Sequence, residues 1–406
     1  MAALSLGAFA LASAASLPCD IFAASGSPCV AAHSVTRALF AAYGGPLYAV
    51  TRASDNRTLN ITPLTPGGAA NAPSQDAFCA RDGCVISTIY DQTLHRNHLS
   101  PAPAGGHVHT PDAPVNASRL RLTLGGSPVY GAYFEPGNGY RNDNTSGVAT
   151  GNDPETIYMV ASGTHFSRGC CFECVFWGGG GRGGAARTRA DTGAHPLPPA
   201  PPPTPPTPHK HRNAARSYGN AETNNKDNGP GSMEALNLGN ASDAKWARGT
   251  DKGPWVMVDL CVAFVPRWGG AQPPFFLRPI LITPTPTTHP RRENGVWGGG
   301  QPGVNPLNTP LAFPFVTAMV KGGSNGFVLK GGNANAGPLH TAFDGPRPPG
   351  GYQPMRKEGA VVLGCGGDNS DFAIGSFFEG ALTVGLSTDA ADDAVQASIV
   401  AAGYGQ

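Results

Sequence analysis

Two acidic residues stand where short apolar strands are expected to end. In Trp255–Leu260 every second side chain points the same way, so Asp259 would share one strand face with Met257. A second apolar run leads through glycines into Asp368, and glycines let another molecule approach the backbone closely. A strand-end cap or an Asp-Asn turn is the commoner role of such acids. The pattern alone therefore leaves a structural and a chemical role open for both.

Three cysteines also lie close together, at Cys170, Cys171 and Cys174. No matching Cys/His set occurs elsewhere, and His107 and His109 lie in a Pro/Gly loop, so we expect no metal and no cofactor. A disulfide between adjacent cysteines closes a strained ring, and such strain is typically retained at functional sites. Spacing alone is equally compatible with two free thiols.

The composition predicts the kind of scaffold that must position these groups. The 406 residues include 56 Gly and 40 Pro, and only 14% are charged, which favours short strands joined by turns over long amphipathic helices. We therefore predict an all-β protein. A formal net charge of +1 gives no general attraction for nucleic acid or an anionic membrane, so a neutral partner such as a sugar fits better.

Short apolar stretches separated by turn residues fill the chain from Pro18 to about Gly169, and Cys84–Tyr90 is one expected strand. Val30–Tyr43 has Ala, Val, Leu and Phe at helix-like spacings, which predicts a helix. The strand pattern returns at Glu293 and continues to Ile399.

Two segments break this pattern. Residues 174–217 contain a Gly/Arg tract and a Pro-rich tract, and residues 261–292 mix apolar and Pro/Thr residues without recognisable turns. Each begins Cys-Val and ends in a residue, Ser217 or Arg292, whose codon can start with A-G. One splice phase would remove both, so we predict that they are translated introns or disordered inserts.

The chain carries several marks of secretion. Residues 1–16 form a short apolar run with small residues at its end, which predicts a signal peptide. Cysteines recur at short spacings, Cys19 with Cys29 and Cys79 with Cys84. Glycosylation sequons occur at Asn56, Asn60, Asn116, Asn144 and Asn240. Together these features indicate an oxidising, extracellular destination.

Many long motifs of this chain, in order, closely resemble glycoside hydrolase family 54, the fungal-type α-L-arabinofuranosidases. They are Pro18–Ile21, Cys29–Ser34, Ile89–Gln92, Gly169–Phe172, Tyr218–Thr223, Gly253–Leu260, Lys357–Gly359 and Gly366–Ser370. The resemblance covers nearly everything from Pro18 to Tyr404 except the two inserts. It implies one jelly-roll-like, concanavalin-like β-sandwich over residues 17–406, which is interrupted by the two inserts. The family often adds a C-terminal arabinose-binding domain, and we expect none in this chain.

The resemblance also implies roles for single residues. The family motif Asp-Leu/Met-Glu-Asn matches Asp259-Leu260 joined to Glu293-Asn294 across the second insert, which makes Glu293 the nucleophile. The Gly-Gly-Asp-Asn-Ser motif makes Asp368 the acid/base. The residues implied to line the sugar pocket are Asp259, Asn294, Gly295, Gly367, Trp246, Cys170 and Cys171. The implied disulfides are Cys19–Cys29, Cys79–Cys84 and Cys170–Cys171.

The chemistry implied is retaining hydrolysis of terminal α-L-arabinofuranosyl groups of arabinan or arabinoxylan by a secreted monomer. Such enzymes need two carboxyls about 5 to 5.5 Å apart. Glu234 is the competing candidate for the nucleophile, and we expect its role to be structural or indirect. Cys365 replaces a residue beside the site that is usually aliphatic in the family. Two alternatives remain open: a sandwich that binds sugar without cleaving it, and an inactive product of a faulty gene model.

Overall fold

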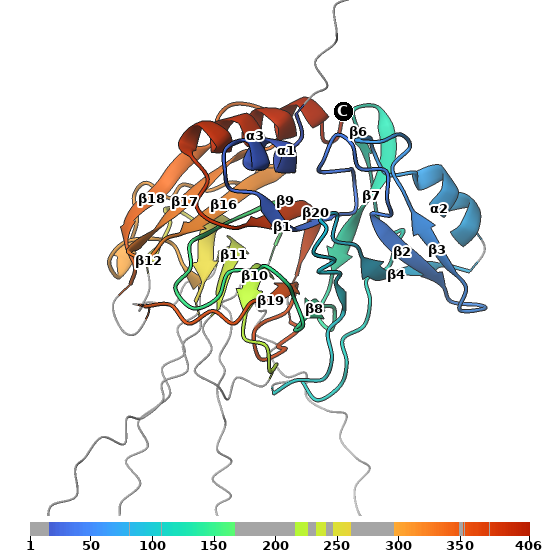
Figure 1. Cartoon of the computed structure of the whole chain (residues 1–406), viewed down its shortest axis with the longest axis horizontal. Coiled ribbons are helices and arrows are strands. Elements are labelled where there is room, and N and C mark those ends of the chain that lie inside the picture. Colours follow the sequence, from blue (N-terminus) through green and yellow to red (C-terminus); the bar gives the residue numbers. More distant parts are fainter. Residues whose placement is uncertain are drawn as a thin grey trace, which may run out of the picture.

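The computed structural model describes most of the chain (Figure 1). The described residues are 16–80, 82–106, 108–166, 216–225, 233–240, 247–260, 296–348, 352, 354–372 and 374–406. Within them, two large sheets of antiparallel strands pack face to face. The prediction of an all-β sandwich is confirmed.

The first sheet has eight strands in the order β18-β17-β16-β9-β20-β7-β6, with β1 also paired to β20. Their bounds are β18 His340–Pro346, β17 Gly326–Asn333, β16 Val316–Gly322, β9 Glu155–Phe166, β20 Gly375–Thr383, β7 Ser127–Phe134, β6 Leu120–Leu124 and β1 Cys29–Ser34. Every residue of β16 and β20 is buried. These central strands are rich in Val, Ala and Phe because both of their faces are covered.

The second sheet has seven strands in the order β14-β13-β11-β10-β19-β8-β5. Their bounds are β14 Val296–Trp297, β13 Trp255–Asp259, β11 Glu234–Gly239, β10 Arg216–Ala221, β19 Ala360–Leu363, β8 Tyr140–Asn142 and β5 Ser100–Pro101. Beside the sandwich, β2 (Tyr48–Arg52) lies between β3 (Thr58–Ile61) and β4 (Cys84–Ile89), and β12 (Ala247–Arg248) pairs with β15 (Gly303–Val304). The expected strand at Cys84–Tyr90 is therefore confirmed as β4.

Alternation along the second sheet sorts its side chains between two apolar clusters. Leu236 and Val258 join the main core, which lies between the sheets. Ala235 and Met257 belong to a smaller cluster on the opposite face. We call this opposite face the outer face of the second sheet. Because neighbouring residues of a strand point to opposite faces, a shift of the strand register by one residue would exchange the side chains of the main core with those of the outer face.

Three helices accompany the strands: α1 Pro18–Ala24, α2 Ala72–Cys79 and α3 Asp389–Ala402. Helices α1 and α3 lie side by side over the first sheet, on the side away from the second sheet (Figure 1). The Thr388 hydroxyl accepts a hydrogen bond from the Ala391 amide at the start of α3, and Gly403 ends the helix with a φ of 67°. Among the described residues, no helix has the length and apolar character needed to cross a membrane.

Two predictions about local structure were wrong. The predicted helix Val30–Tyr43 begins instead as β1, whose backbone pairs with the central strand β20. Long-range pairing overrides the helix-like spacing of its apolar residues. Conversely, the expected strand pattern near Ile399 is helix α3, which lays Val395 and Ile399 on the core.

Both disulfides that the resemblance implied within the described residues are present. Cys19–Cys29 joins α1 to β1 with an S–S length of 2.07 Å, and Cys79–Cys84 joins α2 to β4 with 2.02 Å. The implied Cys170–Cys171 bridge lies outside the described residues. Among the sequon asparagines, Asn56, Asn60, Asn116 and Asn144 are exposed, and Asn240 is half-buried.

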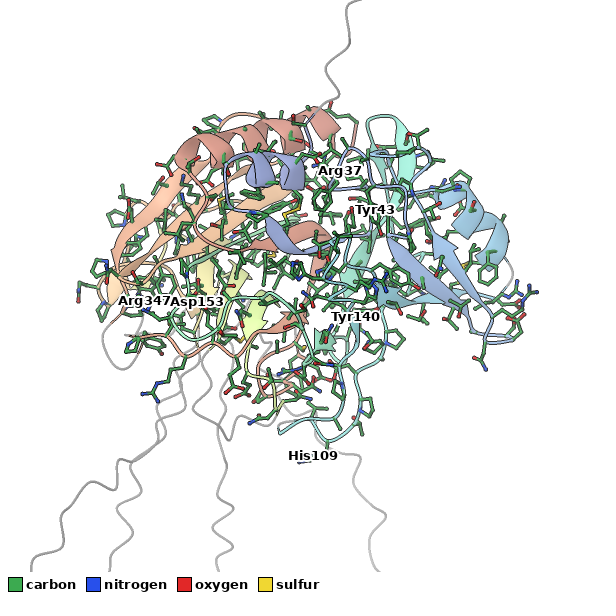
Figure 2. The ribbon with its side chains drawn as sticks, in the orientation of Figure 1. Arg37, Tyr43, His109, Tyr140, Asp153 and Arg347 are labelled. Atoms are coloured by element: carbon green, nitrogen blue, oxygen red, sulfur yellow. A yellow bond between two sulfur atoms is a disulfide. The ribbon has the colours of Figure 1, made fainter. Side chains whose placement is uncertain are left out.

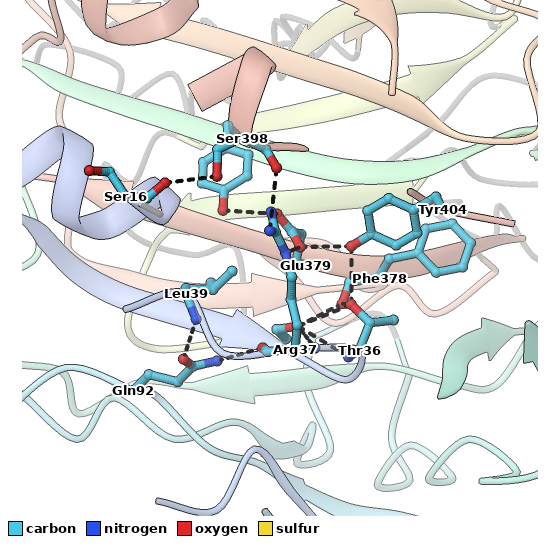
Figure 3. A network of polar contacts seen from close by, with 11 residues as sticks. Ser16, Thr36, Arg37, Leu39, Gln92, Phe378, Glu379, Ser398 and Tyr404 are labelled. Atoms are coloured by element: carbon cyan, nitrogen blue, oxygen red, sulfur yellow. Dashed lines mark hydrogen bonds and ion pairs between the residues drawn. The ribbon is translucent and has the colours of Figure 1, made fainter. Parts of the chain in front are cut away.

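Beneath α3, a buried ion pair joins the segment that follows β1 to β20 (Figure 3). The guanidinium of Arg37 donates two hydrogen bonds to the Glu379 carboxylate, at 2.5 and 2.8 Å. The Tyr404 hydroxyl donates to the same carboxylate at 2.7 Å. These contacts fix the C-terminal end of the chain against the first sheet.

Candidate active site

The carboxylate of Asp259 lies at the end of β13 and is fully buried. Its Oδ2 accepts a hydrogen bond from the Ser217 hydroxyl at 2.8 Å, while its Oδ1 has no hydrogen-bond partner among the described residues. Burial, opposed by the Ser217 hydrogen bond and supported by the negative charge of Asp368, raises the pKa of Asp259 to about 6. Asp259 and Asp368 are therefore within electrostatic reach of each other.

The strand register places Asp259 on the outer face of the second sheet. Asp259 pairs with Ala235 of β11, and Met257 pairs with Asn237, so these side chains share one face. The alternation predicted for Trp255–Leu260 is thus confirmed. Asp259 is the carboxylate of an otherwise apolar strand, on the face that the main core does not occupy.

Asp368 lies in a turn that follows β19, which we call the acid turn, residues 364–370. The backbone amide and the hydroxyl of Ser370 both donate to Oδ1 of Asp368, at 2.9 and 2.8 Å. The Gly366 amide bonds to the Ser370 carbonyl at 3.0 Å and closes the turn. Asn369 takes a left-handed φ of 64°, which Asn tolerates better than most residues. The side chain of Asp368 is thus held within a buried turn.

A backbone segment packs closely on the acid turn from one side. A Cβ atom at Gly105 would lie 2.4 Å from the Cβ of Asn369 and 2.7 Å from the Asp368 carbonyl oxygen. Only glycine allows this approach. The neighbouring Gly106 amide donates to the Asn225 carbonyl at 2.8 Å, so residues 105–106 join the acid turn to the end of the β10 segment.

Two side chains that sequence reasoning missed hold the acid turn. Arg141 of β8 donates to the carbonyl oxygens of Gly366 and Gly367, and Asp112 accepts a hydrogen bond from the side-chain Nδ2 of Asn369 at 2.9 Å. Burial raises the pKa of Asp112 to about 7. Arg141 lies in an ordinary short strand and Asp112 in a loop, so no local pattern could have singled them out.

The competing carboxylate, Glu234, lies on the other side of the sheet. It sits at the start of β11, in register with Asn220, and faces the space between the sheets. Its Oε2 lies 3.2 Å from the Nζ of Lys357, which also lies 3.0 Å from Glu155 of β9. Glu234 is one position away from Ala235, the partner of Asp259, so alternation turns it away from the outer face.

Several predicted site residues lie outside the described residues: Glu293, Asn294, Gly295, Trp246, Cys170 and Cys171. The chain re-enters the described part at Val296, which pairs with Asp259, and Trp297 pairs with Val258. Of the predicted site, the structure therefore brings together Asp259, Gly367 and Asp368. Cys365 is buried next to them, with its thiol 3.5 Å from the Tyr140 carbonyl oxygen.

The arrangement places a buried carboxyl, whose pKa is raised to about 6, within the electrostatic field of a second carboxylate. Paired carboxyl groups in different environments are typical of acid-base sites. Within the described residues, no group of three or more His, Cys, Asp or Glu side chains could hold a metal ion.

Comparisons with known proteins identify the group to which this chain is related. The family model described as "Alpha-L-arabinofuranosidase B, catalytic" matches residues 18–194, 207–265 and 283–405. The gaps in this match, residues 195–206 and 266–282, fall inside the two predicted inserts.

Curated relatives and solved structures agree with this match. A probable α-L-arabinofuranosidase B of Aspergillus clavatus is 40% identical over 396 residues, 96% of this chain and 63% of the relative. An α-L-arabinofuranosidase of Hypocrea jecorina is 41% identical over 392 residues, 95% of this chain and 63% of the relative. This chain thus spans less than two thirds of the length of these relatives.

Among solved structures, an arabinofuranosidase complexed with arabinofuranosyl-α-1,2-xylobiose is 38% identical with a TM-score of 0.74. The comparison covers 96% of this chain and 65% of that one. A GH54 α-L-arabinofuranosidase soaked with a cyclic sulfate inhibitor has the same identity and TM-score, over 96% of this chain and 66% of its own. The chain belongs to the α-L-arabinofuranosidase B catalytic family, glycoside hydrolase family 54.

Proposed function

We propose that this chain is a secreted, exo-acting α-L-arabinofuranosidase that retains configuration at the anomeric carbon. The observation that carries the proposal is the pair Asp259 and Asp368 at the outer face of the second sheet. Asp259 is buried with one carboxylate oxygen unbonded among the described residues, and Asp368 lies in the turn that matches the family's acid/base motif. Buried polar atoms without partners are rare, and a sugar hydroxyl would satisfy this one.

In the proposed mechanism, the carboxylate of Glu293 attacks the anomeric carbon while Asp368 gives its proton to the departing glycosidic oxygen. The carbon–oxygen bond breaks, and the sugar stays attached to Glu293 as an ester. Asp368, now ionised, then takes a proton from water, which attacks the same carbon and releases Glu293. Asp259 accepts a hydrogen bond from the bound arabinose, and Gly367, Asn294, Gly295, Trp246, Cys170 and Cys171 complete the pocket.

The pairing of β13 with β14 supports Glu293 as the nucleophile and residues 261–292 as an insert. Asp259 and Val296 are paired neighbours, as they would be on the two sides of a short hairpin. Without residues 261–292, only Leu260, Glu293, Asn294 and Gly295 would connect them. Four-residue connections are common in hairpins, and Asn-Gly is typical of tight turns. Glu293 would then follow Asp259 by two residues.

For the first predicted insert we propose an earlier end than residue 217. Arg216 and Ser217, its last two residues, belong to β10, where Ser217 pairs with Asn237 and donates to Asp259. We propose that the foreign part ends before Arg216. The gap of the family match at residues 195–206 is consistent with this limit.

The proposed substrates are terminal α-L-arabinofuranosyl groups on arabinan or arabinoxylan. A related arabinofuranosidase was solved with arabinofuranosyl-α-1,2-xylobiose, which is a fragment of this kind. The two disulfides, which form in oxidising compartments, support an extracellular location.

The test is release of nitrophenol from 4-nitrophenyl α-L-arabinofuranoside, by the 406-residue chain and by the chain without residues 261–292. We expect nitrophenol release. Glu293→Gln should abolish this activity, and Asp368→Asn should lower it most on substrates with poor leaving groups. Asp393→Asn, an exposed acid of α3, is the matched control and should leave the rate unchanged. Arabinose binding without any nitrophenol release from either chain would support the non-catalytic alternative and overturn the proposal.

A further inference from the structure

The side chain of Arg141 is fully buried behind the acid turn. Its Nη1 donates to the carbonyl oxygens of Gly366 and Gly367, at 3.0 and 2.8 Å. Its Nη2 donates to the carbonyl oxygen of Glu222, and its Nε to the carboxylate of Asp143. Three of the four acceptors are thus backbone carbonyls.

These carbonyls lie at the two segments that border the site. The Gly367 carbonyl belongs to the peptide group that joins Gly367 to Asp368, so Arg141 fixes the plane immediately before the acid. The Glu222 carbonyl follows β10, the strand that carries Ser217. One guanidinium therefore ties the acid turn to the strand that hydrogen-bonds Asp259.

The opposite end of the acid turn is held independently. The Asn369 side chain bonds to Asp112, and Ser370 holds the Asp368 carboxylate itself. At the other end, Arg141 holds the carbonyl of the peptide group that precedes Asp368 and so limits the rotation of that group. Its neighbour Tyr140 lies on β8, on the side of the molecule away from Arg37 and α3 (Figure 2).

We propose that Arg141 is a positioning residue that sets the orientation of Asp368 for proton transfer. The inference rests on the proposed function, because it takes Asp368 as the acid/base. A planar guanidinium can reach three carbonyls at once, whereas the ammonium of lysine is a compact group on a flexible stem. Lysine in this place would keep the charge and lose the geometry.

The experiment compares two aryl α-L-arabinofuranosides, one with a dinitrophenyl and one with an unsubstituted phenyl leaving group. The good leaving group departs without a proton, and the poor one needs the acid. For Arg141→Lys we expect kcat/KM to fall about 10- to 100-fold on the phenyl substrate and by less than about threefold on the dinitrophenyl substrate, since small displacements of a catalytic group cost about this much. Arg121→Lys, at an exposed ion pair with Asp76, is the matched control and should change neither rate.

Equal losses on both substrates, or no loss on either, would overturn the role of Arg141. Asp368→Asn separates this outcome from failure of the proposed function, because Asp368→Asn itself must show the leaving-group dependence if Asp368 is the acid. Should Arg141→Lys fail to fold, Asp143→Ala removes one acceptor of the guanidinium and leaves the carbonyl contacts. It should lower kcat/KM about threefold more on the phenyl substrate than on the dinitrophenyl substrate, and equal losses on the two substrates would count against the proposal.

Discussion

Two buried carboxylates on opposite sides of the sandwich have very different surroundings. Glu379, beneath α3, receives two hydrogen bonds from Arg37, one from Tyr404 at 2.7 Å and one from Tyr158 at 3.4 Å. Asp259, on the outer face of the second sheet, receives one from Ser217, and its Oδ1 has no hydrogen-bond partner among the described residues.

This difference in hydrogen bonding distinguishes a carboxylate that stabilises the fold from one that is available to a ligand. Burying an ionised group is costly unless hydrogen bonds or an opposite charge compensate, so a fully paired carboxylate costs the fold little. An incompletely paired one destabilises the fold, and such groups are typical of binding and catalytic sites. Glu379 therefore has the contacts of a framework group, whereas Asp259 has one oxygen without a hydrogen-bond partner among the described residues, as expected of a group that binds a ligand.

Arg37→Ala should have the largest effect on stability. It leaves the Glu379 carboxylate buried without its cation, so the free energy of unfolding should fall by about 3–5 kcal/mol. Urea denaturation measures the loss, and the activity of the protein that remains folded should not change. A loss below about 1 kcal/mol would mean that Glu379 is not the framework group described here.

Lys357→Met should come next, because it removes the cation that pairs with both Glu155 and Glu234 between the sheets, while Arg347 still acts electrostatically on Glu234. We expect a loss of about 3 kcal/mol at pH 8. The loss should be smaller at pH 5, because burial already raises the pKa of Glu155 to about 7 and protonation then removes the unpaired charge. Denaturation at both pH values checks this, and an equal loss at each would contradict it.

Asp112→Asn should have the smallest effect, and of opposite sign. Oδ2 of Asp112 has no hydrogen-bond partner among the described residues, and burial raises the pKa of this carboxyl to about 7. A carboxyl whose pKa is higher in the folded state than in the unfolded state does not lower the free energy of unfolding at pH values below its unfolded pKa. As the pH rises from the unfolded pKa to the folded pKa, the free energy of unfolding falls, and above the folded pKa it stays at the lower value. The free energy of unfolding of the variant should therefore be higher than that of the original protein by on the order of 1–2 kcal/mol at pH 8, and the two should be equal at pH 4.

The Asn side chain can accept the same hydrogen bond from Asn369, so activity of Asp112→Asn should stay within about threefold of the original. Thermal unfolding between pH 4 and pH 8 measures the stability profile. A variant that is less stable at pH 8 would show that the carboxylate has a compensating partner.

The sequence predicted the sandwich and the strand that ends at Asp259, because alternation and turn residues are local signals. It failed at Val30–Tyr43, where apolar spacing suits a helix but pairing with β20 decides the structure. It failed again at α3, whose Ala- and Val-rich run was equally compatible with a strand. The strand that pairs with β1 and the helix α1 that α3 contacts both lie far away in the sequence.

The site shows the same limit. Asp259 and Asp368 could be selected from their motifs, whereas their mutual electrostatic contact depends on the sheet and the acid turn. Arg141 and Asp112 have no motif of their own, and only the fold brings them to Gly367 and Asn369. Supporting residues of this kind follow from three-dimensional structure alone.

The central claim is that the carboxylates on the outer face of the second sheet serve the substrate rather than the fold. Asp259→Asn tests it most directly, with kcat/KM for 4-nitrophenyl α-L-arabinofuranoside and the free energy of unfolding measured on the same preparation at pH 7.5. Because Asp259 has a pKa raised to about 6, its charge costs stability at this pH, and the neutral amide should leave stability unchanged or raise it. We predict a fall in kcat/KM of about 10- to 100-fold, the value of one hydrogen bond to a charged group, without loss of stability. Unchanged kcat/KM, or a loss of activity explained by a parallel loss of stability, would contradict the account.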